Sequence, residues 1–131
     1  MGKIKIRDDF KLIIYKENKE FTILKAQEAI KELKYRCIDI SIYNRFLDFS
    51  TVETVRFRPM EMDQFSKMVK KIRPANAETK ICFLCKDLGV IKLVEIFTDY
   101  MKPDYKKILI SQRIDDCTDF LDVDESILLG A

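Results

Sequence analysis

The stretch Arg45-Phe46-Leu47-Asp48-Phe49-Ser50-Thr51 predicts a strand at the centre of a sheet, ending in a cluster of polar side chains. Beyond it, from Met62 to Ile72, apolar residues recur at the spacing of a helix. The chain is therefore expected to run from strand through loop to helix. Ligands of open α/β sheets are bound just beyond the carboxyl ends of the strands. Asp48, Ser50 and Thr51 are therefore the candidate binding residues.

Two short strands and a helix are predicted upstream of this central strand. Residues 4–6 and 10–14 alternate between apolar and polar side chains, which indicates strands joined by a hairpin that turns at Asp8-Asp9. Residues 17–20 predict the next turn. Thr22 is a candidate N-cap for a first helix, with an apolar face that extends to Leu33.

The segments that follow alternate between helix and strand. Residues 35–42 fit either one end of the central strand, with a bulge, or an irregular lead-in to it. Pro59 suits the first turn of a second helix, and Pro74 is expected to end that helix. The apolar run from Thr79 to Cys85 predicts a strand that is buried on both faces.

The last third of the chain continues this alternation. Asp87 is a candidate cap for a third helix that ends before Pro103, residues 107–111 predict a short strand, and residues 114–121 predict a final helix. The order ββ-α-β-α-β-α-β-α predicts an α/β domain with a mixed, mainly parallel sheet of about five strands and four helices.

Length and composition are those of one globular domain. The chain has 131 residues, of which 47% are hydrophobic and 35% charged. This length suits a single core and is too short for two ordinary domains. We expect one domain over residues 1–131, with residues 1–3 and 124–131 as flexible tails. No apolar run approaches the ~20 residues of a membrane span, and the N-terminus lacks a signal peptide's apolar core. A cytoplasmic location without stable membrane insertion is predicted.

The charge is nearly balanced overall but unevenly distributed. The net charge is +2, which gives no overall attraction to nucleic acid, so nucleic acid is not an expected partner. Residues 1–80 carry 18 basic and 12 acidic side chains, whereas residues 81–131 carry 6 basic and 10 acidic ones. A solvated face explains the basic stretch from Arg56 to Arg73 better than a nucleic-acid site does, because only Phe57 accompanies its charges.

Three segments resemble the STAS superfamily, the sulfate-transporter and anti-sigma-factor-antagonist domains, and most of all its short stand-alone bacterial members. Residues 45–50 are similar to the family's central strand, residues 81–90 to a strand followed by the start of a helix, and residues 114–121 to its acidic last helix. The resemblance covers roughly residues 4–122. It implies a STAS-like fold, related to the CRAL-TRIO lipid-binding domains, and a non-enzymatic regulatory role through protein contacts.

One departure from the family concerns its phosphorylation switch. Anti-sigma-factor antagonists carry a phosphorylatable serine at the start of the helix after the central strand. The corresponding loop here, from Thr51 to Met60, contains neither serine nor glycine. The phosphorylation switch therefore does not carry over to this chain.

The residue inventory argues against catalysis and against cofactors. The sequence has no histidine, which removes the commonest general base and the commonest metal ligand. Its three glycines, Gly2, Gly89 and Gly130, form no phosphate-binding loop. We therefore predict that the chain is not an enzyme and holds no cofactor.

The four cysteines are expected to be reduced, free of metal and mostly buried. Cys82 and Cys85 have the spacing of a redox pair, but in a strand their side chains leave by opposite faces. Cys37 and Cys117 are too far apart in sequence to complete a four-thiolate zinc site with them. A bulky thiol reagent is expected to label at most one of the four, and the candidate is Cys85, near the end of its strand.

Two functions from different classes follow. The first is a non-enzymatic binding or regulatory domain that acts through protein–protein contacts. The second is a carrier or sensor of a small apolar or lipid-like ligand, for which the candidate residues are Met62, Phe65, Met68, Val94 and Phe97. An apolar cavity beneath the second and third helices would favour the ligand, and a filled core with a flat exposed apolar patch would favour the protein partner.

Self-association is a further expectation. Ile127, Leu128 and Leu129 lie beyond the last predicted helix and should pack on their own domain or on a neighbour, because exposed apolar area is unfavourable in water. The basic and acidic halves of the chain offer complementary charges. We therefore predict a homodimer at micromolar concentration that deletion of residues 126–131 weakens.

Overall fold

Five strands form one sheet in the computed structural model, in the spatial order β1-β2-β3-β4-β5. The structure describes residues 2–36, 42–72, 79–101 and 107–130. The first two strands are antiparallel, and each further neighbour is parallel to the one before it. The strands are β1 (Lys3–Arg7), β2 (Leu12–Thr22), β3 (Asn44–Arg56), β4 (Ile81–Cys85) and β5 (Ile108–Ser111).

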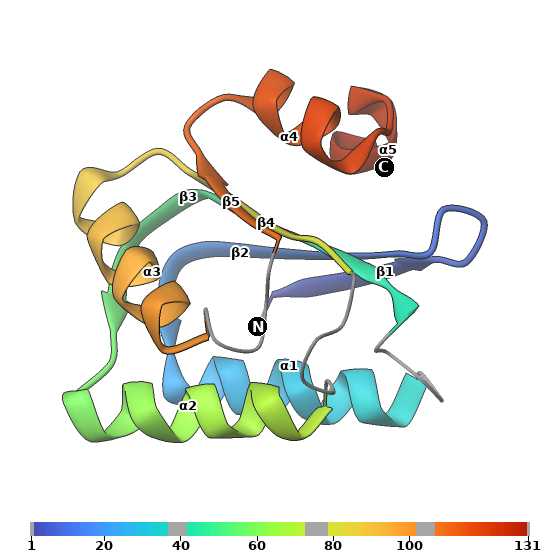
Figure 1. Cartoon of the computed structure of the whole chain (residues 1–131). Coiled ribbons are helices and arrows are strands. Elements are labelled where there is room, and N and C mark those ends of the chain that lie inside the picture. The colour runs from blue at the N-terminus through green and yellow to red at the C-terminus, as the bar shows by residue number, and fades with distance from the viewer. Residues whose placement is uncertain (1, 37–41, 73–78, 102–106, 131) are drawn as a thin grey trace.

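The helices cover both faces of this sheet (Figure 1). Three helices lie on one face, and two shorter helices near the C-terminus lie on the other. The helices are α1 (Ile23–Arg36), α2 (Pro59–Ile72), α3 (Leu88–Met101), α4 (Ile114–Leu121) and α5 (Glu125–Leu129). The predicted fold class, a single α/β domain with a mixed and mainly parallel sheet, is confirmed, and α5 adds a fifth, short helix.

Strand β4 is the clearest match between sequence and structure. All five of its residues are buried, as its unbroken apolar run predicts. Alternate side chains enter two separate cores, because successive residues of a strand point to opposite faces. Phe83 and Cys85 belong to the core under α1–α3, whereas Cys82 and Leu84 belong to the core under α4 and α5.

The predicted helix caps are also present. The hydroxyl Oγ1 of Thr22 accepts a hydrogen bond from the Lys25 amide at 3.3 Å. Oδ1 of Asp87 accepts one from the Val90 amide at 3.0 Å. Each cap satisfies a backbone donor that the first turn of a helix would otherwise leave without a partner.

Two boundaries differ from the sequence predictions, and both involve the same pair of strands. Residues 17–20 form no turn, because β2 continues to Thr22 through two shifts of register. Lys19 adopts the left-handed conformation there, with φ of 60°. The stretch predicted as a loop, Thr51 to Met60, is strand as far as Arg56. Polar residues that suggested turns instead lie on a two-stranded ribbon that extends beyond β4.

The C-terminal segment predicted as a flexible tail, residues 124–131, is largely helical. Residues 125–129 form α5, in which Leu128 is only 4% exposed. Leu128 packs with Phe46 and Leu121 in the core beneath α4 and α5. The apolar end of the chain therefore covers its own domain. The ambiguous residues 35–42 lie mostly outside the described part of the chain, apart from the end of α1 and Ile42.

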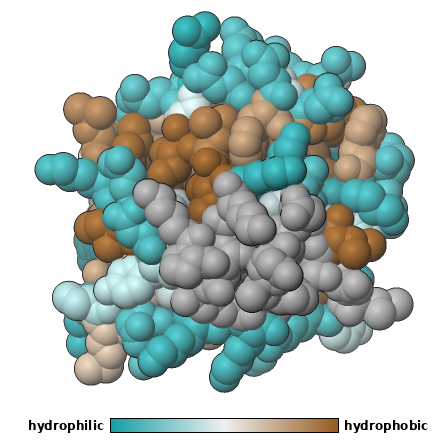
Figure 2. Space-filling model, viewed as in Figure 1, coloured by the Kyte–Doolittle hydropathy of each residue, from teal (hydrophilic) through white to brown (hydrophobic). Residues whose placement is uncertain are grey.

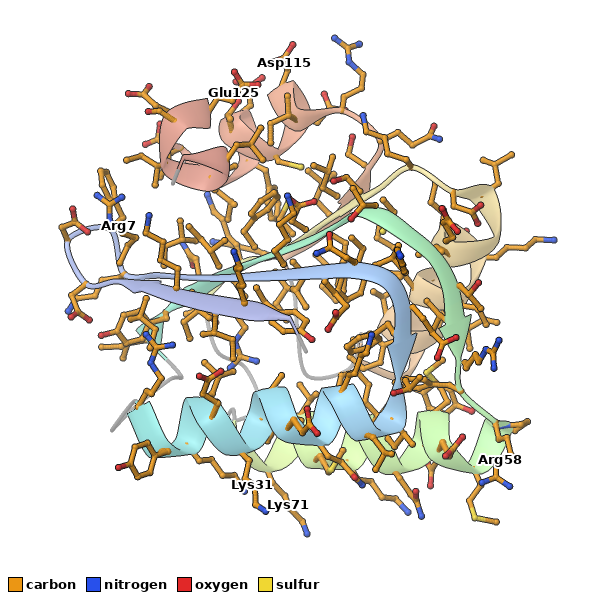
Figure 3. The ribbon with its side chains drawn as sticks, turned by 180° about the vertical axis from the view of Figure 1, so that it is seen from behind. Arg7, Lys31, Arg58, Lys71, Asp115 and Glu125 are labelled. Carbon is orange, nitrogen blue, oxygen red and sulfur yellow. The ribbon has the colours of Figure 1, made fainter. Side chains whose placement is uncertain are left out.

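The charges divide between the two helical layers, as Figure 3 shows. Lys31 of α1 and Lys71 of α2 project from the same side of the molecule, and Asp115 and Glu125 lie on the opposite side. The six acidic side chains of residues 114–129 are all exposed. No helix in the described ranges combines the length and apolar character needed to cross a bilayer.

Candidate functional site

Asp48 is a buried carboxylate that accepts hydrogen bonds from its own strand. Its side chain lies on the α4 side of the sheet with that of Phe46 and is 2% exposed. Oδ1 accepts hydrogen bonds from the Ser50 amide at 3.0 Å and from the Ser50 hydroxyl at 2.6 Å. Oδ2 lies 4.0 Å from the half-exposed ammonium of Lys16. The carboxylate therefore stabilises the backbone of β3, as a structural role for this residue predicts.

Thr51 completes the polar trio but faces another way. Its hydroxyl donates to Oδ1 of Asn18 at 2.6 Å, across the β2–β3 pair. The trio does not lie at a strand end, because β3 continues to Arg56. A structural role predicts that these side chains cap the turn from strand to helix or bond nearby backbone amides. No strand end lies here, and Asp48 does the second by accepting a hydrogen bond from the Ser50 amide.

A second buried polar cluster occurs where the sequence predicts a turn. Glu17 is 2% exposed, and its Oε2 accepts a hydrogen bond from the Tyr15 hydroxyl at 2.5 Å. The ammonium of Lys25 lies 3.6 Å from its other carboxylate oxygen. Burial, and then the contact with Glu17, raise the pKa of the Tyr15 phenol. The cluster joins β2 to α1, and no spacing in the sequence indicates it.

Three of the cysteines are fully buried. Cys82, Cys85 and Cys117 each have 0% exposure and form no disulfide, and Cys37 lies outside the described residues. Burial raises the pKa of the Cys85 thiol to about 12. A hydrogen bond with Cys117, followed by burial, raises the pKa of Cys82. The expectation that labelling reaches Cys85 is therefore wrong, because its thiol is buried.

An apolar cavity of about 80 Å³ lies between α2, α3 and the sheet, and it is partly open to the surface. Four of the five predicted pocket residues line it, and Met68 does not. The lining residues are Phe21, Arg45, Leu47, Phe49, Val55, Phe57, Met62, Phe65, Val69, Ile81, Phe83, Leu93, Val94 and Phe97.

Six phenylalanines form a closed circuit of ring contacts around this cavity. Adjacent ring centroids are 4.9–6.1 Å apart, within the range of favourable aromatic pairs. The circuit draws on β2, β3, β4, α2, α3 and the short link before α2. We call it the phenylalanine ring, and its members in order are Phe21, Phe57, Phe65, Phe97, Phe83 and Phe49.

A second cavity of about 80 Å³ lies beside the first, beneath α1 and α2. Phe65 and Val69 of α2 form part of the wall of both cavities. Arg45 also belongs to both walls and is only 8% exposed. Of the described residues that line either cavity, Arg45 alone carries a charged side chain. It lies near the start of β3, with Leu47 and Phe49 on the same face of the strand.

The surface has an apolar patch as well. Figure 2 shows apolar surface where β5 and the start of α3 lie in Figure 1. Leu88 is 73% exposed, and Ile108, Leu109 and Ile110 of the edge strand β5 are half-buried. Across the described ranges, no three cysteine, aspartate or glutamate side chains are arranged to hold a metal ion.

Comparison of the chain with protein-family models, with curated proteins and with solved structures gives no match. The STAS resemblance therefore remains a prediction from the sequence.

Proposed function

We propose that this chain is a non-enzymatic binding domain, a carrier or sensor, whose ligand is a small apolar molecule held within the phenylalanine ring. The observation that carries the proposal is the cavity between α2, α3 and the sheet. Ligand sites are typically concave and apolar with few polar groups, and this cavity has that character.

The size of the cavity limits the ligand. One water needs about 10–15 Å³ of cavity volume, so about 80 Å³ accommodates about six groups of that size. The cavity is partly open to the surface, so a single alkyl chain can fill it and extend to its mouth, whereas a two-chain lipid is too large. The aromatic walls favour such a ligand because aromatic side chains offer a large apolar contact area.

A non-enzymatic role agrees with the positions and bonds of the buried polar groups. Asp48 and Ser50 bond each other on the far side of the sheet, and Glu17 is occupied by Tyr15 and Lys25. The lining of the first cavity offers a ligand no carboxylate or amine that could act as a general base.

The test uses one substitution at two positions of α3. Leu93→Trp places an indole against the cavity, and Leu88→Trp places the same group on the surface, where Leu88 is 73% exposed. Calorimetric titration with octan-1-ol and with octanoate measures binding. We expect wild type and Leu88→Trp to bind at least one of these probes equally well, and Leu93→Trp to bind it about tenfold more weakly.

Overpacking a core lowers the stability of a protein by about 1–3 kcal/mol. A second variant with a smaller change in volume is therefore needed beside Leu93→Trp. Val94→Leu adds one methylene at the same wall and should weaken binding in the same direction. The proposal fails if neither probe binds the wild type, or if a folded Leu93→Trp or Val94→Leu variant binds as well as the wild type.

Protein contact is the second candidate function, and the apolar patch beside β5 favours it. An edge strand presents backbone groups to which another chain can add. Leu88→Lys, at the exposed start of α3 in the same patch, should weaken such a contact and leave octanoate binding unchanged. Native mass spectrometry of the protein purified from its own cells distinguishes a bound partner, a bound small molecule and neither.

A further inference from the structure

Two side chains of α2 separate the two apolar cavities. Helix α2 packs against both α1 and α3, and one cavity lies between α2 and α3 while the other lies beneath α1 and α2. Phe65 and Val69, one turn apart on the inward face of α2, belong to the walls of both cavities. Phe21 and Leu47 of the sheet also belong to both walls. The cavities are therefore neighbouring compartments over one floor, divided at Phe65 and Val69.

Phe65 is the larger of these two side chains, and three neighbouring rings hold it in place. Its ring centroid lies 4.9 Å from that of Phe97, 5.4 Å from that of Phe57 and 6.1 Å from that of Phe21. A ring with several aromatic neighbours loses these favourable contacts when it turns away. Phe65 therefore forms a fixed wall between the first cavity and the second.

The lining of the cavities determines which part of a ligand can enter. Almost the whole exposed lining of both cavities consists of carbon atoms. A polar head group inside either one would give up its hydrogen bonds to water without finding partners, which is unfavourable. A hydrocarbon chain makes no such bonds and is stabilised by burial. The head group of an amphiphile therefore stays at the mouth of the cavity, and its chain enters.

We propose that the ligand is a single-chain amphiphile of about eight carbons, a straight-chain carboxylate or alcohol, and that Phe65 sets this length. This inference rests on the proposed function and specifies its ligand class. The first cavity of about 80 Å³ holds about six groups the size of a water. About six chain carbons therefore fill it, and the rest of the chain reaches the mouth. A longer chain would need the second cavity, which lies behind Phe65.

The experiment measures the length limit by calorimetric titration of straight-chain carboxylates from hexanoate to dodecanoate. Each buried methylene strengthens binding about fourfold. Wild type should therefore gain about fourfold per added methylene from hexanoate to octanoate, and less than about twofold in total from octanoate to dodecanoate. Phe65→Ala joins the two cavities, so it should bind dodecanoate at least about tenfold more tightly than octanoate.

Ala29→Leu distinguishes the second cavity from the space that the missing ring leaves. Ala29 of α1 is 9% exposed and lines the second cavity but not the first. Added to Phe65→Ala, Ala29→Leu fills part of the second cavity and should remove most of the gain for dodecanoate. Phe65→Leu is a smaller change to the core, and it should give a smaller gain for dodecanoate in the same direction.

Three results overturn the length inference and leave the apolar ligand site intact. The first is a wild-type affinity that keeps rising about fourfold per methylene as far as dodecanoate. The second is a folded Phe65→Ala or Phe65→Leu variant whose affinity levels off at octanoate, as in the wild type. The third is a gain in Phe65→Ala that survives the addition of Ala29→Leu. Failure of octan-1-ol and of every carboxylate to bind the wild type overturns the proposed function itself.

Discussion

Asp48 shows how a buried carboxylate serves the fold at the scale of one residue. Replacement by alanine leaves the Ser50 amide and hydroxyl without their acceptor, and a lost buried partner costs about 1–3 kcal/mol. We expect Asp48→Ala to lower the free energy of unfolding in urea by that amount. Lys16 adds little, because its ammonium is half-exposed and 4.0 Å away.

Glu53→Ala is the matched control for this prediction. Glu53 lies on the same strand but is exposed, and surface substitutions usually change stability by less than about 0.5 kcal/mol. Equal effects of the two substitutions would contradict the structural role of Asp48.

The buried thiol of Cys85 leads to a prediction for the stability of the protein at alkaline pH. Its pKa rises from 9.0 to about 12 in the folded protein, so the fold favours the neutral thiol. The resulting stabilisation is fully present below the pKa of this thiol in the unfolded chain. It is lost as the pH rises through the pKa of the thiol in the folded protein. Urea unfolding between about pH 8 and about pH 11 should show a decline in stability that is shallower for Cys85→Ala.

Thiol labelling gives an independent measurement of the same burial. A bulky reagent should leave Cys82, Cys85 and Cys117 unmodified in native protein and react with them in urea, because all three are fully buried. Rapid native labelling of Cys85 would show that its end of β4 is open to solvent.

At the scale of elements, two neighbouring leucines of α5 differ in burial and should therefore differ in their contribution to stability. Leu128 is 4% exposed and Leu129 is 49% exposed. Leu128→Ala should cost about 2–5 kcal/mol, as buried leucine truncations do, whereas Leu129→Ala should cost much less. Thermal or urea unfolding measures both. Similar losses at the two positions would mean that α5 does not pack as described.

The elements that the sequence predicts well are those with one unambiguous pattern. Strand β4 is apolar at every position, and Thr22 and Asp87 precede clear helical spacing. The ends of β2 and β3 are harder to predict from the sequence, because they carry polar residues on an exposed ribbon. Only the pairing of the two strands with each other, and the register shifts near Lys19, reveal that these residues are strand.

At the scale of the whole molecule, the charged faces bear on self-association. Acidic α4 and α5 lie on the opposite side of the sheet from Lys31 and Lys71 (Figure 3). Contact between the acidic face of one copy and the lysine face of the next would therefore join copies head to tail. It would not form a two-fold symmetric dimer. Deletion of residues 126–131 is a poor test of a dimer, because it removes the buried Leu128.

We predict self-association at micromolar concentration that weakens with salt, because exposed charges are screened within about 8 Å at physiological ionic strength. Sedimentation should show a smaller assembly for the double variant Lys31→Glu, Lys71→Glu than for wild type. Arg7→Gln, on the β1–β2 hairpin, is the control and should sediment like wild type. A monomer at every concentration and low salt would refute the prediction.

The candidate site was only partly predictable, for a physical reason. Helical spacing on α2 and α3 identifies Phe65 and Phe97, because an amphipathic helix turns one face inward. The other rings come from strands and from the link at Phe57, and their meeting depends on how the β2–β3 ribbon extends beyond β4. Arg45 is one basic residue among 24 Lys and Arg, and only the sheet shows that it is buried.

The central claim is that the cavity within the phenylalanine ring binds the ligand, and the most direct measurement locates a probe there. Nuclear Overhauser contacts between octanoate and the protein's labelled methyl groups give its position. We predict contacts to Met62 and Val94, which line the cavity, and none to the exposed Leu24 and Leu88. Contacts confined to exposed methyl groups would contradict the account.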